Sequence, residues 1–267
     1  MAFRLGIVGL VHLHLWWYLE SIRRIPDAQI SCAADPHPEL LEKAGSILHL
    51  DAGHLYGDYR QMLQKEPLEA CLVFVENNRH AEVFEACARR GLHVMVEKPI
   101  ASSLKEADRM LAIQRRCKVR LMVNYPIFHW AFPHACLELI RSNRIGRPWL
   151  MRFATGHSGP ENFCPPYFLE WLMDRKKNGG GALQDFGTYG AALFAWYFGR
   201  PDRVSAAAGK FVKSGYQAED HAIITVTYEK AGVVGTIEGT WCSTPDLLVF
   251  NLFGEKGAVF NLSLIHI

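Results

Sequence analysis

An acidic and a basic residue follow directly on a short apolar run in the first half of the chain. The run covers residues 94–96, comes after Gly91, and is typical of a strand buried on both faces of a parallel sheet. Glu97 and Lys98 end it, and Pro99 donates no N–H, so the strand stops there. Because ligands of open α/β sheets lie at the carboxyl ends of the strands, Lys98 can direct its ammonium group at a bound molecule. A solvated strand end would look the same, so this pattern alone leaves both interpretations open.

A second group of residues able to do chemistry follows a glycine triplet at 179–181. Glycine at these positions permits close backbone approach and positive φ. Asp185 and Tyr189 are four residues apart on the helix expected next, so both should project from one face, with Gly187 leaving room between them. A carboxylate in a first helical turn also complements the helix dipole, which is a purely structural alternative for Asp185.

The first turn of the chain carries an incomplete phosphate-binding signature. In the usual pattern Gly-x-Gly-x-x-Gly, the second glycine lets the backbone approach a pyrophosphate group and the third lets the helix pack on the strand. Here Gly9, Val11 and His14 stand at these positions, and a helical segment is expected at 13–25. Backbone N–H groups at a helix N-terminus attract phosphate whatever their side chains. We therefore retain Gly9, Val11 and His12 as candidate cofactor-binding residues.

His12 and His14, at alternate positions, raise the question of a metal site. No carboxylate or cysteine lies near them in the sequence, and two histidines alone more often serve packing and hydrogen bonding. The seven cysteines are scattered and form no Cys-x-x-Cys pair. This pattern is typical of reduced thiols in a cytoplasmic enzyme. We therefore predict no metal site and a cytoplasmic location.

A carboxylate follows the second predicted strand, residues 28–34. Asp35 comes 26 residues after Gly9. At this position a carboxylate accepts hydrogen bonds from an adenosine ribose and repels a 2′-phosphate, which favours NAD over NADP. Alternatively, Asp35 starts a turn and caps the helix expected at 38–44.

Strand-like and helical segments alternate through the first 123 residues. This alternation implies right-handed crossovers and a parallel sheet. We therefore predict an α/β protein in which residues 1–123 form an N-terminal Rossmann-type domain that binds NAD(P). The expected strands are 3–8, 28–34, 70–75, 94–96 and 119–123, and the expected helices are 13–25, 38–44, 58–65, 81–90 and 103–116.

The remaining part of the chain is richer in strands. Its alternating segments are typical of antiparallel strands in an open sheet packed on helices. We predict a C-terminal α+β domain, residues 124–261, built on an open, mostly antiparallel sheet. Its expected elements are a helix at 132–142, a strand at 149–154, an ordered loop at 158–181, and strands at 221–228, 233–241 and 247–253.

The charge balance and the hydropathy pattern bear on the kind of partner. Lys plus Arg total 29 against 27 for Asp plus Glu, so the chain has no strong basic field to hold nucleic acid or an anionic membrane. The apolar run from Leu5 to Leu19 contains histidines and is too short to span a bilayer. We expect a small-molecule substrate, and neither a nucleic acid nor a membrane as partner.

Together the motifs resemble the glucose–fructose oxidoreductase / inositol dehydrogenase / MocA family of nicotinamide-dependent oxidoreductases. The resemblance covers the chain up to about Asn261. The motifs that carry it are, in chain order, Asn77 with His80, then Glu97-Lys98-Pro99, and Gly-Gly-Gly-x-Leu-x-Asp-x-Gly from Gly179 to Gly187.

The resemblance implies an NAD(P)-dependent oxidoreductase acting on a sugar, a polyol or a related cyclic alcohol, with NAD as the expected cofactor. It implies that Tyr189, activated by the ammonium of Lys98, exchanges a proton with a substrate hydroxyl or carbonyl, while Asp185 orients either group. Hydride then moves between that carbon and the nicotinamide. Two alternatives stay open, a glycoside hydrolase that uses bound NAD and a non-catalytic nucleotide-binding regulator.

The resemblance also implies roles for residues outside these motifs. Asn77 and Glu97 are expected near the cofactor, although Asn77 could equally lie in a helix N-cap region. Tyr125 is expected to contact the substrate, and Pro126 after it predicts a more apolar pocket than a free hexose needs. Trp171 could line that pocket or fill the core.

The family uses the outer face of its C-terminal sheet for assembly, so a homodimer or homotetramer through this sheet is expected. Val226, Tyr228 and Trp241 are the candidate interface residues.

The last six residues, 262–267, do not read as native sequence. They correspond to the translation of a transposon end used in preparing sequencing libraries. Our hypothesis is that the native part of this chain stops near Asn261 and that residues 262–267 are a sequencing artefact. Because the family is normally longer, we expect the chain to be truncated, with the last strands of the C-terminal sheet missing. A genomic read that confirms a native stop codon after Ile267 would refute this hypothesis.

Overall fold

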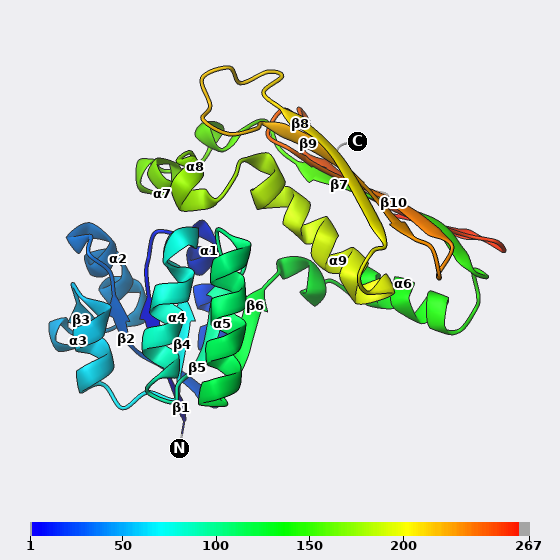
Figure 1. Ribbon diagram of the computed structural model, residues 1–267. Coiled ribbons are helices and arrows are strands. Elements are labelled where there is room, and N and C mark those ends of the chain that lie inside the picture. Colours follow the sequence, from blue (N-terminus) through cyan, green and yellow to red (C-terminus); the bar gives the residue numbers. More distant parts are fainter. Residues whose placement is uncertain (1, 262–267) are drawn as a thin grey trace. The chain divides into compact units, whose positions relative to one another are not determined.

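The computed structural model describes residues 2–261, which form two compact units with one six-stranded sheet each (Figure 1). Unit 1 contains the described residues up to Asn124, and the segments Cys164–Leu172 and Lys176–Gly179 also pack in it. Unit 2 contains Tyr125–Phe163, Met173–Arg175 and the described residues from Gly180 onward. Residues 262–267, where a sequencing artefact is expected, lie outside the described part.

The sheet of unit 1 is entirely parallel and has the strand order β3-β2-β1-β4-β5-β6. This is the strand order of a Rossmann fold. Strands β1 to β3 are added toward one edge of the sheet and β4 to β6 toward the other, so the strand order reverses between β1 and β4. The predicted α/β class and the parallel sheet are therefore confirmed. The strands are β1 Phe3–Val8, β2 Ala28–Ala34, β3 Leu55–Tyr56, β4 Ala70–Val73, β5 His93–Glu97 and β6 Leu121–Asn124.

Helices cover this sheet, and their ends follow capping rules. The Ser103 hydroxyl oxygen accepts the N–H of Glu106 at the start of α5 and so caps the helix, and the same hydroxyl donates to the Glu106 carboxylate. The Asp58 carboxylate accepts the N–H of Arg60 at the start of α3 in the same manner. The helices of the first 124 residues are α1 Leu13–Arg23, α2 Pro38–Leu48, α3 Tyr59–Lys65, α4 His80–Ala88 and α5 Leu104–Cys117, with shorter turns at Ala52–His54 and Asn77–Arg79.

Unit 2 is built on a mixed sheet with the order β12-β11-β7-β10-β9-β8. Its neighbours are antiparallel except for β7 and β10, which run parallel. The open, mostly antiparallel sheet was predicted and is confirmed. The strands are β7 Pro148–Gly156, β8 Arg203–Gly209, β9 His221–Tyr228, β10 Val233–Thr240, β11 Leu247–Gly254 and β12 Ala258–Phe260, and the longer helices are α6 Ala131–Arg141 and α9 Thr188–Phe198.

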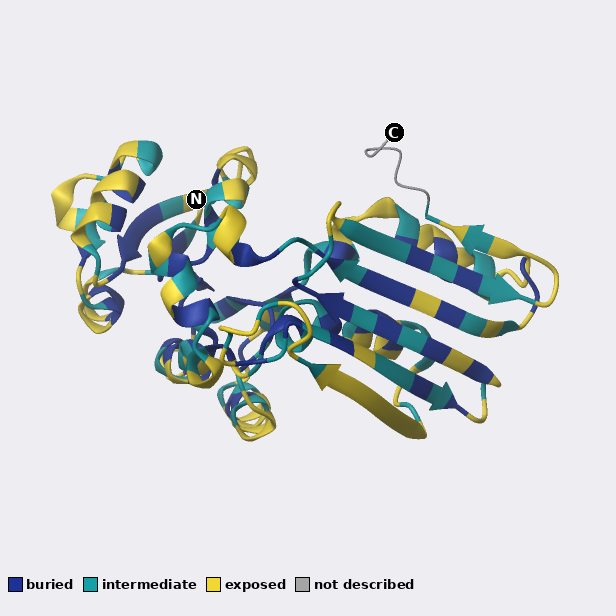
Figure 2. Ribbon diagram, turned by 90° about the horizontal axis from the view of Figure 1, so that it is seen from above, coloured by how far each residue is buried: buried dark blue, intermediate teal, exposed yellow. Residues whose placement is uncertain are grey.

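One face of the unit 2 sheet is buried and the other is partly exposed (Figure 2). Val226 and Tyr228, the candidate interface residues of β9, are buried in the core of unit 2, and Trp241 is buried as well. The prediction that these three face outward was wrong. Side chains alternate along a strand, so choosing the wrong parity moves every residue to the opposite face. Ile223 of β9 and Val234 of β10 have the opposite parity and are exposed.

Two short helices lie in the segment expected to be an ordered loop. They are α7, Pro166–Leu172, and α8, Arg175–Asn178. Helix α7 packs in unit 1, although about forty residues of unit 2 separate it from β6 in sequence. This arrangement brings its aromatic side chains to the first turn of the chain.

Candidate active site

The turn after β1 needs glycine at its first position. Gly9 has φ +85°, and a Cβ atom there would lie 2.5 Å from the side chain and 2.6 Å from the backbone nitrogen of Val75. Its N–H donates to the carbonyl of Ala34 at 2.8 Å. The turn therefore holds the start of α1 against the ends of β2 and β4, at the point where the strand order reverses. Val11 and His12, which follow in this turn, are buried.

The side chain of Asp35 connects this turn to the loop after β2 through hydrogen bonds. Its Oδ2 accepts the N–H of Leu10 at 2.6 Å, and its Oδ1 accepts the N–H of His37 at 2.9 Å. The His37 ring nitrogen Nδ1 lies 2.6 Å from the same Oδ1. The buried carboxylate thus has a structural role, and its expected contact with a ribose remains a prediction.

Glu97 ends β5 as a fully buried carboxylate. Its Oε1 accepts a hydrogen bond from the Asn124 amide, and its Oε2 accepts the N–H of Lys98 at 3.0 Å. Burial by itself raises the pKa of Glu97, but His12, His14 and Lys98 outweigh burial and lower the pKa to about 2. Glu97 is therefore ionised at neutral pH. The next residue, Lys98, is also buried and joins Pro99 through a cis peptide bond.

The expectation that no carboxylate lies near His12 and His14 was wrong. Nδ1 of His14 lies 3.1 Å from Oε2 of Glu97, and Nε2 of His12 lies 3.9 Å from the same oxygen. Strand β4 pairs with both β1 and β5, and this pairing brings Glu97 close to the two histidines. Glu97 is more than 80 residues away from them in the sequence, so inspection of the neighbouring residues alone cannot reveal the contact. Burial lowers the pKa of His12 well below its ordinary value, although Glu97 opposes this shift.

Aromatic rings of α7 cover this turn. The rings of Phe168 and Trp171 lie 5.2 and 5.8 Å from the ring of His12, centre to centre. Trp171, which was expected either to line a substrate pocket or to fill core, is buried in unit 1 beside His12. The sequence offered no signal for this contact, because the segment around Trp171 lacks a clear period.

Asn77 begins the short helical turn Asn77–Arg79 that follows β4, and one of its polar atoms, Oδ1, has no hydrogen-bond partner among the described residues. Its Nδ2 donates to the side-chain oxygen of Asn178 at 2.7 Å and to the Asn178 carbonyl at 3.2 Å. Its own Oδ1 is buried and accepts no hydrogen bond from the described residues. A buried acceptor without a donor is costly, so this atom is suited to a ligand hydroxyl.

Asp185 and Tyr189 are positioned within unit 2. Asp185 lies in a π-helical turn, Leu183–Gly187, and its Oδ2 accepts the indole N–H of Trp241 at 3.0 Å. Tyr189 follows in α9, and its ring packs edge-on against Tyr125 with centres 5.6 Å apart. Unit 2 thus brings a predicted catalytic residue and a predicted substrate-binding residue together. Trp241, which sequence reasoning assigned to an interface, instead holds a predicted catalytic carboxylate.

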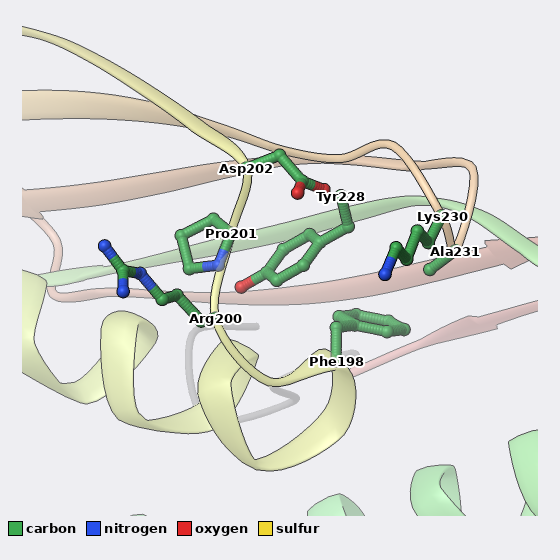
Figure 3. Close-up of a pocket in the computed structure, with 7 residues that line it drawn as sticks. All are labelled: Phe198, Arg200, Pro201, Asp202, Tyr228, Lys230 and Ala231. Atoms are coloured by element: carbon green, nitrogen blue, oxygen red, sulfur yellow. The ribbon is translucent and has the colours of Figure 1, made fainter.

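A separate cavity of about 500 Å³ lies at the end of α9 in unit 2 (Figure 3). Arg200 and Lys230 line it, and the carboxylate of Asp202 there accepts the N–H of Glu229. None of the predicted site residues is among those that line this cavity. We therefore do not count it as part of the candidate active site.

The fold and the residues at the carboxyl ends of its parallel strands define a class of protein. A sheet in this order, with a glycine turn at the reversal point, is the framework of nucleotide-dependent oxidoreductases. Residues 3–125 match the oxidoreductase family with an NAD-binding Rossmann fold, and residues 134–260 match the GFO/IDH/MocA C-terminal domain. The chain therefore belongs to the GFO/IDH/MocA family of oxidoreductases, which confirms the predicted family.

Individual relatives share this fold over most of the chain. The myo-inositol 2-dehydrogenase of Thermotoga maritima is 23% identical over 96% of this chain and 74% of its own length. The D-apiose dehydrogenase of Paraburkholderia graminis is 28% identical over 89% of this chain and 59% of its own length. The crystal structure of myo-inositol 2-dehydrogenase from Lactobacillus plantarum aligns with a TM-score of 0.86 at 18% identity, covering 98% of this chain and 76% of that one.

The residues of unit 1 fit a dinucleotide at two points. The Gly9 turn opens onto the N-terminus of α1, where backbone N–H groups attract phosphate. The unsatisfied Oδ1 of Asn77 can accept a ribose hydroxyl. Phe168 and Trp171 pack on the ring of His12 in this turn. Among the described residues, no helix is both long and apolar enough to cross a membrane.

Proposed function

We propose that this protein is an NAD-dependent dehydrogenase or reductase that acts on a CH–OH group of a sugar, a polyol or a related cyclic alcohol. The observation that carries the proposal is the position of Lys98, directly after β5 on the carboxyl side of a Rossmann-type sheet. The relatives named above are dehydrogenases of a cyclic polyol and of a sugar. In this proposal residues 1–123 bind the cofactor and residues 124–261 bind the substrate.

The proposed chemistry uses Lys98, Asp185 and Tyr189 on one substrate. Tyr189 exchanges a proton with the substrate oxygen, and the ammonium of Lys98 favours the ionised phenol that this exchange requires. Asp185, fixed by the indole of Trp241, orients the substrate hydroxyl or the lysine. Bound nicotinamide supplies the hydride acceptor or donor. Tyr125, against the Tyr189 ring, contacts the substrate.

We propose NAD rather than NADP as the cofactor. Asp35 supports this choice, because a carboxylate at the end of β2 repels a 2′-phosphate. Titration of the purified protein with NAD and with NADP, followed by tryptophan fluorescence, compares the two affinities. Tighter binding of NADP would refute this part of the proposal.

The catalytic proposal is tested by measuring turnover of a panel of polyols and sugars. We expect Lys98→Ala and Tyr189→Phe each to lower kcat by a factor of about 10² to 10⁴, the contribution usual for proton transfer. Lys105→Ala removes an exposed lysine of α5. Tyr197→Phe removes a hydroxyl of α9 that donates to the Pro133 carbonyl.

These two control variants should keep the turnover of the unchanged protein. Binding of NAD without turnover of any substrate in the panel would contradict the enzymatic proposal and favour a regulatory role. Equal turnover in Lys98→Ala would remove that lysine from the mechanism.

We also propose that the protein forms a homodimer or homotetramer through the outer face of the unit 2 sheet, and that it works in the cytoplasm. Support for assembly comes from Ile223 and Val234, whose apolar side chains are each 43% exposed on that face. Support for a reducing compartment comes from the seven cysteines, all of them free thiols. Sedimentation velocity tests the oligomeric state, and a single monomeric species at micromolar concentration would refute it.

A further inference from the structure

We propose that unit 1 binds one divalent transition-metal ion, of which Zn²⁺ is the model, through His12, His14 and Glu97. Ion binding at this site does not require the proposed hydride transfer. One ligand atom from each of the three residues lies within 4.8 Å of the other two. Two imidazoles and one carboxylate form a ligand set that zinc and related ions prefer.

The distances in the cluster are close to those that a bound ion requires. Ligand atoms about 2.0 to 2.1 Å from a tetrahedral zinc ion lie roughly 3.3 Å from one another. Oε2 of Glu97 lies 3.1 Å from Nδ1 of His14 and 3.9 Å from Nε2 of His12. Side-chain rotations alone can close the remaining gaps, because His14 is only partly buried and its ring can adjust.

The surroundings already orient the carboxylate. The Asn124 amide donates to Oε1 and the backbone N–H of Lys98 donates to Oε2, so Glu97 presents Oε2 to both imidazoles. Such outer contacts are typical of metal ligands, whose side chains are fixed by hydrogen bonds from the next layer of residues. The ionised carboxylate offsets part of the charge of the ion, whereas the ammonium of Lys98 acts against it.

Coordination changes one hydrogen bond at the start of α1. Nδ1 of His12 accepts the N–H of His14 at 3.2 Å, which places the proton of a neutral imidazole on Nε2. Coordination through Nε2 therefore moves that proton to Nδ1 and ends this hydrogen bond. The backbone amide of His14 is the reporter of this change.

The three residues leave a tetrahedral ion with one open position. An open position, filled by water or by a substrate oxygen, is usual where an ion has three protein ligands of this kind. The partly exposed ring of His14 marks the side from which an ion and a fourth ligand can enter. The proposed ion thus lies beside Lys98 and can polarise an oxygen bound there.

The experiment measures ion binding to the whole chain after removal of metal with a chelator. Co²⁺, whose visible spectrum reports tetrahedral coordination, is titrated first, and calorimetry with Zn²⁺ gives the stoichiometry and Kd. We expect one ion per chain, with affinity at least tenfold weaker in His14→Ala and in Glu97→Gln. His54→Ala is the matched control, because His54 pairs with Asp51 at 2.8 Å on the surface of the same unit.

Each outcome decides for or against the site. Loss of binding in His14→Ala with retention in His54→Ala supports it, as does a shift of the His14 amide signal in NMR spectra of the ion complex. The absence of stoichiometric binding, or equal binding in His14→Ala, overturns it, and the second result would place the ion elsewhere in the chain. If Glu97→Gln does not fold, His14→Ala decides, since its side chain is partly exposed. NAD binding, measured separately without metal, tests the proposed function independently.

Discussion

The two units differ in where they bury polar side chains. Among the described residues, nine buried polar or charged side chains belong to unit 1 and two belong to unit 2. In unit 1 most of them lie where parallel strands end, a place that the topology creates. The two in unit 2 are Asp220 and Thr240, and those in unit 1 are His12, Ser31, Asp35, Asn77, His80, Glu97, Lys98, Asn124 and Asn178.

The difference separates polar groups that can serve ligand binding from those that stabilise the fold. Burying a polar group costs free energy unless the group is hydrogen-bonded. A unit that buries many polar groups therefore either pairs them with one another or uses them to bind a ligand. Unit 1 has close backbone contacts beside those groups, as at Gly9. Unit 2 also has close backbone contacts, as at Gly181, but among the described residues it buries a single carboxylate, that of Asp220. Of the three sites compared below, a substitution should cost most at the Gly9 turn, less at Asp220, and least on the outer face of the unit 2 sheet.

Of the three sites compared, the largest effect on stability is expected for Gly9→Ala. The added Cβ meets the backbone of Val75 at a residue with φ +85°. Overpacking costs about 1 to 3 kcal/mol, and a left-handed conformation costs roughly 1 to 2 kcal/mol for a residue other than glycine. Urea unfolding should thus show a loss of about 2 to 5 kcal/mol.

Gly91→Ala separates these two costs. Gly91 has φ +77°, but nothing lies within 4 Å of the added Cβ, so only the conformational cost of about 1 to 2 kcal/mol applies. If the two variants unfold at the same urea concentration, close packing at Gly9 does not matter, and the ranking of the Gly9 turn above Asp220 fails.

An intermediate effect is expected for Asp220→Asn. The Asp220 carboxylate accepts the N–H groups of Phe211, Val212 and Lys213. An amide presents one oxygen and a donor to the same three groups. Hydrogen bonds to a charged group contribute about 1.5 to 3 kcal/mol, and we expect a loss in this range at pH 7.

The contribution of Asp220 to the free energy of unfolding depends on pH. Burial tends to raise the pKa of Asp220, but the three backbone N–H groups outweigh burial and lower it. A lowered folded pKa gives stability that is present above the unfolded value, about 3.9, and is lost as the pH falls through the folded value. The difference between Asp220→Asn and the unchanged protein should therefore shrink below about pH 4. A constant difference down to pH 2 would contradict this account.

The smallest effect on stability is expected on the outer face of the unit 2 sheet. Ile223→Glu and Val234→Glu replace half-exposed side chains, and surface substitutions usually change stability by less than about 0.5 kcal/mol. If this face joins two copies of the chain, sedimentation velocity should detect monomers in the double variant. Destabilisation as large as that of Asp220→Asn would show instead that this face is buried within one chain.

The sequence predicted the periodic elements and failed where pairing partners are distant. Apolar runs bounded by glycine and proline placed β1, β2 and β5 closely, because local pattern and burial coincide there. Short edge strands such as β3 and β12 depend on a neighbouring strand rather than on their own composition, and they were missed. The parity of β9 was misjudged because both faces of that strand carry apolar residues.

The candidate site was predictable in part. Lys98 and Asp185 stood in recognisable motifs, and the glycine triplet predicted the positive φ found at Gly179. The approach of Glu97 to His12 was not predictable, because it depends on which strands become neighbours. The same holds for the packing of α7 in unit 1.

The discontinuity of unit 1 has a consequence for synthesis on the ribosome. A nascent chain that has emerged only as far as Asn124 lacks Phe168 and Trp171, and the rings of these residues cover the first turn. Domains generally fold as units while the chain elongates from its N-terminus. All six strands of the first sheet lie within the first 124 residues, but unit 1 as a whole is completed only after translation has passed Gly179.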